Sequence, residues 1–409
     1  MIERFFYLDV PNLRFPGFES KWKTRKLGEI ADKVNSGKTP LGGETVYTKE
    51  GVLFIRSQNV NNDRLELDNS VFIPEFVNNQ MKNSIVGSND ILLNITGASL
   101  GRSCVVPEDF KMGNVNQHVC IIRLKENYNP RFVQPIFSSY KGQTIFINLQ
   151  TGSGREGLNF ESIKGIKLSI PQKDEQQKIA SFLCLIDERI STQNKIIEQL
   201  ETLIKGLSEK LFSQKIRFKG FTDKWELKNL GEICEFHKGN PLSKSSIIKD
   251  GNFKCIHYGE LFTTYKAVIS DIASLTNNDG FKSKIGDILM PSSDVTPLGL
   301  ATASVLLEDN VVLGGDINIL RPRSSINPIF LSYLLNTEKK KIIELVSGTT
   351  VKHIYNKDLK KIKLYVPYVE EQIKIAKLLS SIDTKIEAET NLLDKYQSQK
   401  QYLLKDLFI

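Results

Sequence analysis

The sequence predicts an α+β protein with two mixed, mostly β domains, related by duplication about a pseudo-two-fold axis and separated by two long antiparallel coiled-coil helices. Three observations support this prediction. A unit of about 200 residues occurs twice, each copy is rich in short β-like runs, and each copy ends in a long helical pattern. A chain of 409 residues also exceeds one ordinary hydrophobic core, so two or three domains are expected.

The duplication is clearest at the two ends of the unit. RFPGFESKW at 14–22 returns as RFKGFTDKW at 217–225, and LGEI follows both copies. PQKDEQQKIASFLCLIDERI at 171–190 returns as PYVEEQIKIAKLLSSIDTKI at 367–386. The interiors match poorly. Two copies with matching ends and different interiors indicate two domains that recognise different targets.

The interior of each copy predicts a mixed domain made mostly of strands, and the two domains are placed at 1–165 and 214–362. A helix is expected late in each copy, because Asn327 and Pro328 suit the start of a helix running towards Leu345. Clusters of Gly, Asn, Asp and Ser separate the β-like runs, which are VLFIRSQNV (52–60), DILLNITG (90–97), HVCIIRL (118–124), NFKCIHYGEL (252–261), DILMPS (287–292) and VVLGGDINIL (311–320).

The last part of each copy, 166–213 and 363–409, predicts a long helix. Apolar residues follow steps of four and three, as in a coiled-coil seam. About 38 residues of helix would form a rod of roughly 57 Å, which would hold the two domains apart at a fixed distance. The seam residues are Ile179, Leu183, Ile186, Ile190, Ile197, Leu200, Ile204, Leu207 and Leu211, and then Ile375, Leu379, Ile382, Ile386, Leu393, Tyr396, Leu403 and Leu407.

Three seam positions are polar: Gln193 in the first helix, and Glu389 and Lys400 in the second. Gln193 and Glu389 are repeat partners near the middle of their helices. If the helices are antiparallel, these two residues meet at the crossing and fix the register of the pair. Alternatively, both face a water-filled gap or a partner protein.

Composition and charge narrow the class of protein. A hydrophobic content of 40% and a charged content of 25% are typical of a soluble globular protein. The net charge of +8 suits a polyanionic partner, but also a solvated lysine-rich surface. The five scattered cysteines and four separated histidines fit neither a disulfide framework nor a metal site. With no signal peptide or membrane-length apolar stretch in the sequence, a cytoplasmic protein without membrane contact is expected.

Several motifs resemble the specificity subunit of type I restriction–modification enzymes. VPNLRFPGF with KLGEI resembles the opening of these subunits, and P-x-x-x-E-Q-x-x-I, at 171–179 and 367–375, resembles the start of their central helix. The second unit departs from the family pattern, with KGNPLSK at 238–244 and GGDIN at 314–318. In the first unit, pieces similar to the family's target recognition domains are SGKTP (36–40), FIRSQNV (54–60), ITGASLGRS (95–103), NVNQHV (114–119) and TGSG (151–154).

The resemblance implies a non-catalytic DNA-recognition subunit. Each interior domain would be a target recognition domain that reads one half of a split site in double-stranded DNA. The helix pair would set the unread gap and dock two methyltransferase subunits, whose target would be adenine N6. S-adenosylmethionine would be the cofactor of those partners, and no cofactor is expected in this chain. Nuclease–translocase subunits would join the core for restriction.

Reading DNA requires Lys and Arg for phosphates, and Arg, Asn, Gln, Ser and Thr for base edges. Each candidate could instead be an ordinary loop residue, and Asn116 and Gln117 could equally tie down loop backbone. The candidates of the first unit are Lys38, Thr39, Arg56, Gln58, Asn59, Thr96, Ser99, Arg102, Asn116, Gln117, His118, Ser153 and Arg155. Those of the second are Lys238, Asn240, Ser243, Lys244, His257, Tyr258, Ser292, Ser293, Asp294, Lys352 and His353.

Enzymatic activity of the chain itself is not supported by its motifs. GKT at 37–39 resembles the end of a phosphate-binding loop, but Asp32 stands where that loop requires glycine. NPRF (129–132) and NPIF (327–330) lack the second proline of the Asn-Pro-Pro-aromatic motif of amino-methyltransferases. The alternative to a DNA reader is a non-enzymatic coiled-coil adaptor whose lateral domains bind proteins.

Overall fold

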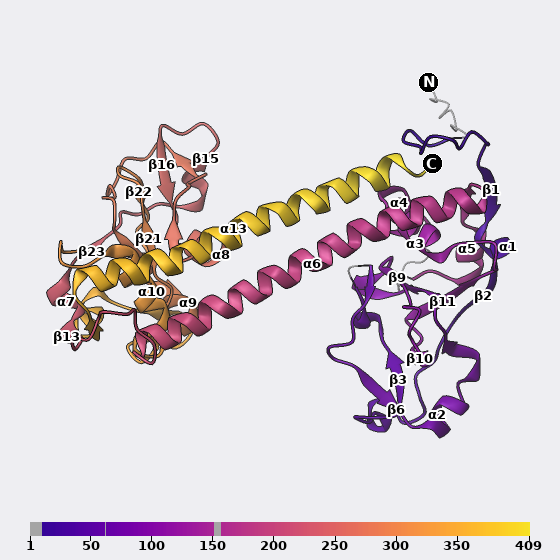
Figure 1. The fold of residues 1–409 in the computed structure, drawn as a ribbon, viewed down its shortest axis with the longest axis horizontal. Helices are drawn as coiled ribbons and strands as arrows, with labels where there is room; N and C mark the ends of the chain where they lie inside the picture. Colours follow the sequence, from indigo (N-terminus) through magenta and orange to yellow (C-terminus); the bar gives the residue numbers. More distant parts are fainter. Residues whose placement is uncertain (1–9, 62, 151–156) are drawn as a thin grey trace. The chain divides into compact units, whose positions relative to one another are not determined.

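The computed structural model describes residues 10–61, 63–150 and 157–409. The chain divides into two compact units: unit 1 is formed by 1–194 with 392–409, and unit 2 by 195–391. Each unit contains one mixed domain and a part of both long helices, α6 (Lys173–Phe212) and α13 (Val369–Asp406), as Figure 1 shows. The predicted fold class is confirmed.

Two four-stranded sheets build the domain of unit 1. Their strand orders are β2-β11-β8-β9 and β6-β3-β10-β7, and β1 and β12 form a separate pair. The strands are β1 (Lys23–Lys26), β2 (Ala31–Ser36), β3 (Val52–Ile55), β4 (Val60–Asn61), β5 (Arg64–Leu65), β6 (Val71–Ile73), β7 (Ile85–Val86), β8 (Ile91–Asn94), β9 (Ser103–Val105), β10 (Gly113–Val115), β11 (Val119–Leu124) and β12 (Lys167–Ile170). The α-helices are α1 (Leu27–Ile30), α2 (Glu75–Asn79), α3 (Pro130–Ser138), α4 (Tyr140–Leu149) and α5 (Phe160–Gly165).

Unit 2 repeats this plan with a five-stranded sheet, β14-β23-β19-β21-β17, and a four-stranded sheet, β15-β18-β16-β22. The strands are β13 (Glu226–Asn229), β14 (Cys234–Lys238), β15 (Ile247–Ile248), β16 (Phe253–Ile256), β17 (Val268–Ile269), β18 (Leu275–Thr276), β19 (Ile288–Pro291), β20 (Ser293–Asp294), β21 (Ser304–Leu306), β22 (Val312–Leu313), β23 (Ile317–Pro322), β24 (Lys352–His353) and β25 (Lys363–Val366). The α-helices are α7 (Leu230–Ile233), α8 (Glu260–Thr263), α9 (Pro297–Leu300), α10 (Pro328–Thr337), α11 (Lys339–Ile343) and α12 (Asn356–Leu359).

The helix predicted to begin at Asn327 and Pro328 is present as α10, but it ends at Thr337, and a second helix, α11, continues towards Leu345. The Asn327 side chain caps the helix by accepting a hydrogen bond from Phe330 N at 3.0 Å. Asn327 N in turn donates to Gln372 Oε1 at 2.8 Å, and Gln372 Nε2 donates to Pro367 O at 2.8 Å. The glutamine of the P-x-x-x-E-Q motif therefore binds the start of α13 to the start of α10, and the same contacts recur in unit 1 through Gln176.

A buried ion pair joins the two ends of the repeated segment in unit 1. Arg14 Nε lies 2.7 Å from Glu175 Oε1, and Arg14 Nη2 lies 2.8 Å from Glu175 Oε2. Trp22 Nε1 donates to the same carboxylate at 3.2 Å. The Glu175 side chain is 1% exposed, and its hydrogen bonds raise the pKa of Arg14. The opening motif is thus tied to the first turn of α6.

Unit 2 contains the same arrangement. Arg217 donates to both oxygens of Glu371 at 3.0 and 2.8 Å, and Trp225 Nε1 donates to Oε2 at 3.1 Å. The Glu371 side chain is 2% exposed. The RF-x-G-F…W motif and the P-x-x-x-E-Q motif therefore recur together because they are the two halves of one contact.

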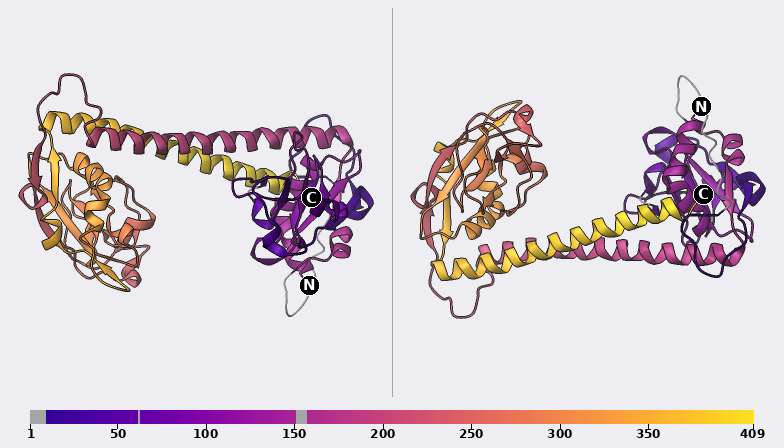
Figure 2. Two further views of the ribbon diagram at one scale, coloured as in Figure 1. Left: turned by 90° about the horizontal axis from the view of Figure 1, so that it is seen from below. Right: turned by 90° about the horizontal axis from the view of Figure 1, so that it is seen from above.

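The long helices pack in antiparallel orientation. In unit 1, Ile179 and Leu183 of α6 share a core cluster with Leu403 of α13. In unit 2, Leu211 near the end of α6 shares a cluster with Ile375 near the start of α13. The start of each helix thus lies beside the end of the other, as Figure 2 also shows. Among the described residues, no helix is long and apolar enough to cross a membrane.

Lys400, the polar residue near the end of the seam, is paired inside unit 1. Its Nζ lies 2.7 Å from Asp63 Oδ2 and 2.7 Å from Asp187 Oδ1. Asp63, in the turn between β4 and β5, also accepts hydrogen bonds from Gln134 Nε2 at 3.1 Å and from Ser138 Oγ. The polar seam position therefore anchors the unit 1 domain to both long helices.

Unit 2 uses different chemistry at the equivalent place. Asp383, the repeat partner of Asp187, accepts a hydrogen bond from the Tyr333 hydroxyl of α10. Burial raises the pKa of Asp383 and also that of Tyr333. An ionic anchor in one unit thus corresponds to a tyrosine–carboxyl hydrogen bond in the other.

Replacing Arg217 with Met is expected to lower the free energy of unfolding of unit 2 by about 3–5 kcal/mol, because Glu371 remains buried without its cation. Denaturant unfolding followed by tryptophan fluorescence measures this, since Trp225 contacts the same carboxylate. The control is Lys361→Met, which removes an exposed pair with Asp358 and should cost less than about 1 kcal/mol. Equal effects of the two variants would contradict the role given to the buried pair.

Lys400→Met is expected to lower the free energy of unfolding of unit 1 by about 2–3 kcal/mol near neutral pH, less than for a fully buried pair. Burial lowers the pKa of Lys400, but Asp63 and Asp187 outweigh this and raise it above 10.5. The folded chain therefore holds this proton more tightly than the unfolded chain. The contribution is complete below the ordinary lysine pKa and is lost as pH rises through the raised value.

Denaturant unfolding of wild type and Lys400→Met at about pH 8 and about pH 11.5 checks this direction. The difference between the two proteins should shrink at the higher pH. A difference that stays constant would show that packing, rather than charge, makes Lys400 important.

Candidate nucleic-acid interface

The candidate residues of unit 1 lie in loops that meet at one end of the two sheets. Gly37 N donates to Asn116 O at 3.2 Å, which joins the loop after β2 to the turn after β10. Ile95 N donates to His118 O at 3.0 Å, which adds the end of β8. Leu158 N donates to Ile95 O at 2.9 Å, which adds the segment that begins at 157. Four loops distant in sequence therefore converge.

Four of the candidates form one chain of hydrogen bonds at this meeting point. Thr39 Oγ1 donates to Gln117 Oε1 at 2.7 Å. Gln117 Nε2 lies 3.0 Å from His118 Nε2, and His118 Nδ1 lies 2.6 Å from Thr96 Oγ1. Because an amide nitrogen only donates, this arrangement fits a neutral His118 that accepts at Nε2 and donates from Nδ1. Thr39 and Gln117 are exposed, so the chain presents oriented polar groups at the surface.

Glycine is required in the loop that follows β2. A Cβ atom added to Gly37 would lie 1.6 Å from Val115 O. In unit 2, a Cβ atom on Gly239 would lie 2.0 Å from Gly314 O. The loop after β2 in unit 1 and the loop after β14 in unit 2 therefore lie in backbone contact with the end of the neighbouring sheet. This contact holds Lys38 beside the turn after β10 and Asn240 beside the turn after β22.

Two candidate amides of unit 1 are committed to the loop backbone. Asn59, 3% exposed, accepts from Arg56 N at 3.0 Å and donates to Glu66 O at 2.9 Å. Asn116, 9% exposed, accepts from His118 N at 3.0 Å. The sequence left open whether Asn116 and Gln117 contact DNA or bind loop backbone. The Asn116 side chain binds loop backbone, whereas the Gln117 side chain is exposed.

The other candidates of unit 1 lie around the same loops. Arg56 donates from Nη2 to Asn69 O at 3.1 Å, and its guanidinium carbon lies 5.9 Å from the centre of the Tyr47 ring. Arg102 is exposed and donates to Asn61 Oδ1 at 3.0 Å. Lys38 and Gln58 are exposed and Ser99 is half-buried, whereas Ser153 and Arg155 lie outside the described residues.

Unit 2 brings the equivalent loops together. Asn240 N donates to Leu313 O at 3.1 Å, and Ser292 N donates to Asp316 O at 2.8 Å. Ile354 N donates to Ser292 O at 3.1 Å. The strand pair β20–β24 then places Ser293 opposite His353 and Asp294 opposite Lys352. Seven candidates, Lys238, Asn240, Ser292, Ser293, Asp294, Lys352 and His353, thus lie in these converging segments.

Some candidates of unit 2 are used internally. Asp294 accepts from Val295 N and from Thr296 Oγ1, both at 2.7 Å. Ser292 is 6% exposed. His257 Nδ1 accepts from Gly259 N at 3.1 Å. The His257 ring also contacts the Tyr258 ring, with 4.5 Å between their centres. Ser243 and Lys244 are exposed in the loop after β14, where the Ser243 hydroxyl contacts those of Ser245 and Ser246.

Tyr355 is a surface residue of this region that the sequence analysis did not select. Its ring stacks on that of His353, with 6.1 Å between centres and 20° between planes. The Tyr355 side chain is 48% exposed. The KHIY run at 352–355 could have indicated it, because an aromatic two residues after a candidate lies on the same face of an extended segment.

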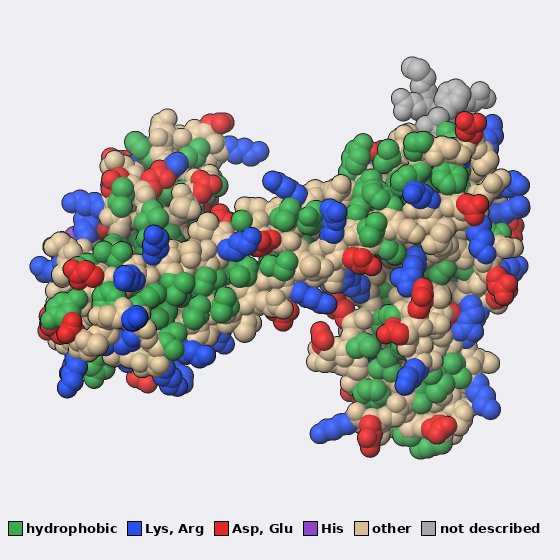
Figure 3. Space-filling model, in the orientation of Figure 1, with side chains coloured by type: hydrophobic (Ala, Val, Ile, Leu, Met, Phe, Trp, Pro, Cys, Tyr) green, Lys and Arg blue, Asp and Glu red, His purple; other side chains and the backbone are tan. Residues whose placement is uncertain are grey.

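Charge alone does not locate the interface. On the face drawn in Figure 3, Lys and Arg side chains are interspersed with Asp and Glu on both units. Within the described part of the chain, no group of three or more His, Cys, Asp or Glu side chains could hold a metal ion. The observation that singles out the candidate interface is the convergence of polar loops at one sheet end in each unit.

Comparison with known proteins matches both copies of the repeated unit to one family. The family described as "Type I restriction modification DNA specificity domain" matches residues 19–202 and again 222–396. The type I restriction enzyme MjaVIII specificity subunit of Methanocaldococcus jannaschii is 26% identical over 81% of this chain and 80% of its own length. The putative MjaX specificity subunit of the same organism is 23% identical, over 94% and 92%.

A solved structure shares the fold. The S subunit of the type I restriction–modification system from M. genitalium superposes with a TM-score of 0.64 at 20% identity, covering 98% of this chain and 99% of that one. The resemblance found in the sequence is therefore confirmed. Because the family model matches both copies of the repeated unit, the chain belongs to the type I restriction–modification DNA specificity domain family.

Proposed function

We propose that this chain is the DNA-specificity subunit of a type I restriction–modification complex. Residues 1–165 read one half of a bipartite double-stranded site, and residues 214–362 read the other half. The observation that carries this proposal is that the same loops converge at the same sheet end in both units, while the side chains on them differ. A constant frame with variable polar loops suits two readers of unlike half-sites.

The loop chemistry supports direct reading of DNA. In unit 1, the exposed Gln117 amide and Thr39 hydroxyl are oriented by His118, and an amide can bond bidentately to adenine. Lys38, next to Thr39 in the chain, and Arg102 of the same domain are exposed cations, suited to phosphate or guanine. In unit 2 the corresponding loops carry Lys238, Asn240, Lys352 and His353. The chain is a non-catalytic subunit, and its partners modify or cleave the DNA.

Two grooves support docking of two methyltransferase subunits. In unit 1, a groove of about 710 Å³ lies between the domain and α6 and includes Arg131, Leu183 and Asp187. In unit 2, a groove of about 510 Å³ lies between the domain and α13 and includes Tyr265 and Asp383. Because Asp187 and Asp383 are repeat partners, the two grooves suit two copies of one partner. Nuclease–translocase subunits would join this core.

The helix pair is proposed to set the unread gap between the half-sites. Both α6 and α13 contribute residues to unit 1 and to unit 2. Gln193 is 5% exposed, and Glu389 pairs with Lys385 one turn earlier. The expected meeting of Gln193 with Glu389 stays a prediction. The adaptor alternative is not favoured, because the family is defined by DNA specificity.

Co-expression with the neighbouring methyltransferase subunit in a methylation-free host should produce methylated adenines in one bipartite, asymmetric motif. Long-read sequencing maps these adenines. Replacing residues 30–165 with those of a relative is the matched variant, and it should change one half of the motif and leave the other half and the gap intact. Methylation without sequence preference by a stable complex would overturn the proposal.

Inserting seven residues, about two helical turns, after Gln193 and after Glu389 should lengthen the unread gap. Seven residues add about 10 Å of helix, or about three base pairs at 3.4 Å per step. Both half-sites should stay the same, because neither domain changes. The methylated motif reports the gap directly, and an unchanged gap would rule out the helix pair as its determinant.

A further inference from the structure

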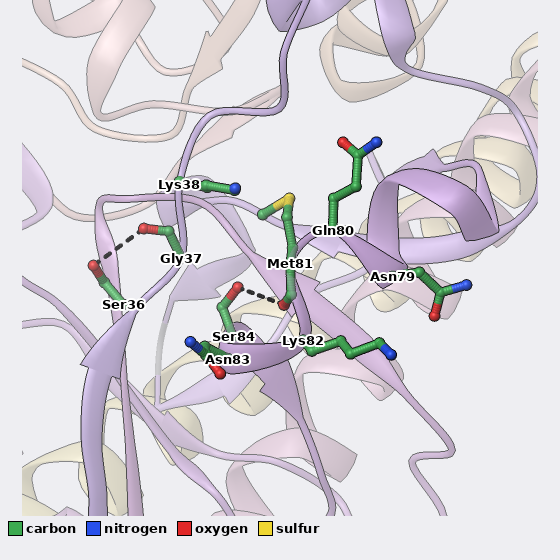
Figure 4. A pocket seen from close by; sticks show the side chains of 9 residues that line it. All are labelled: Ser36, Gly37, Lys38, Asn79, Gln80, Met81, Lys82, Asn83 and Ser84. Atoms are coloured by element: carbon green, nitrogen blue, oxygen red, sulfur yellow. Dashed lines mark hydrogen bonds between the residues drawn. The ribbon is translucent and has the colours of Figure 1, made fainter.

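A pocket of about 330 Å³ lies on the unit 1 domain beside the converging loops. Its wall on one side is formed by residues 36–38 at the end of β2, and on the other side by residues 79–84. Figure 4 shows the Lys38 side chain reaching towards Met81, with the Gln80 amide on the same side. Residues 79–84 were not among the candidates found in the sequence.

The pocket wall is held by a buried amide. Asn114, fully buried in β10, donates to Asn78 Oδ1 at 2.9 Å and to Met81 O at 3.0 Å. Its Oδ1 accepts from Ser84 Oγ at 2.6 Å. From the other side, Asn35 of β2 donates to Asn83 O at 2.6 Å. The segment is therefore fixed at both ends, although Gln80, Lys82 and Asn83 are exposed.

The same strand connects the pocket to the hydrogen-bonded loops. Asn114 holds the pocket wall, and two residues later Asn116 begins the turn that carries Gln117 and His118. Gly37 lines the pocket and contacts Val115 and Asn116. A DNA strand lying on Gln117 would therefore pass beside the pocket mouth.

We propose that this pocket binds a backbone phosphate of the DNA next to the half-site read by unit 1. The inference rests on the function proposed above. The Lys38 ammonium group and the Gln80 amide, which lie on the same side of the pocket in Figure 4, are suited to bind phosphate, whereas the Lys82 side chain extends away from Lys38. Base edges lie at the bottom of a groove and are reached by protruding side chains, whereas a phosphate projects from the backbone and can enter a concave pocket. The contact would position the reader without adding sequence information.

The pocket belongs to unit 1. In its sheet, β10 is flanked by β3 and by β7, and β7 directly follows the pocket segment. In unit 2 the equivalent strand is β22, an edge strand that pairs with β16. On the other edge of β22, the described residues form a single bridge, between Lys282 and Val312, instead of a strand. The proposed contact is therefore expected at one half-site only.

The test uses the complete complex with its methyltransferase subunits and a duplex that carries the motif found by the methylation map. Lys38→Gln should weaken binding, and the salt slope should fall by about 0.9 for the phosphate lost. The affinity deficit should then shrink about three- to fourfold between 50 and 200 mM salt. Lys167→Gln, an exposed lysine on β12 of the same domain, removes one charge away from the pocket and is the control.

A methylphosphonate scan locates the contact. In the wild-type complex, a neutral linkage at one position beside the unit 1 half-site should weaken binding, and the Lys38→Gln variant should be insensitive at that position. Full sensitivity of the variant, or a salt slope equal to that of Lys167→Gln, would overturn the proposal. A changed methylation motif would also overturn it, because the pocket would then read a base. If the proposed function itself were wrong, the wild-type complex would yield no methylation motif, so this outcome differs from a failure of the phosphate pocket.

Discussion

The buried carboxylate at the start of each long helix is the contact on which the rest of the molecule depends. Glu175 and Glu371 are nearly inaccessible, so each must be paired to remain ionised inside the protein. Arg14 and Arg217 supply the charge, and a tryptophan fills the remaining acceptor site. The opening segment, the domain and the helix are thereby fixed to one another in each unit.

This arrangement separates the parts that hold the fold from the parts that can vary. The sheets and the helix seams share continuous apolar clusters, in which a changed side chain leaves a cavity or a clash. The converging loops are bound mainly through backbone hydrogen bonds, such as Ile95 N to His118 O and Ser292 N to Asp316 O. Backbone contacts do not depend on side-chain identity. The loops can therefore differ between the units while their positions are kept.

The sequence predicted the features that arise from periodicity and local chemistry. The duplication, the two helices and the Asn-Pro start of α10 all follow from spacing and residue type. Contacts between distant residues were not predictable: Lys400 pairs with Asp63, 337 positions away, and a single sequence gives no sign of it. For the site, residue type identified the loops but not the burial that commits Asn59 and Asn116 to the backbone. The pocket at 79–84 was missed because its amides lie in a helical turn, outside the β-like runs.

The two anchors between domain and helix bear on how such chains exchange parts. A unit 1 domain moved into the second position would bring the Asp63 carboxylate with it. The repeat partner of Lys400 is Ile204, which supplies no ammonium group. The transplanted carboxylate would then stand against an apolar helix face without a cation. Recombination between the halves of such chains would therefore be asymmetric. The loops could be exchanged between the two positions, but the domain with Asp63 could be moved to the second position only if a lysine replaced Ile204.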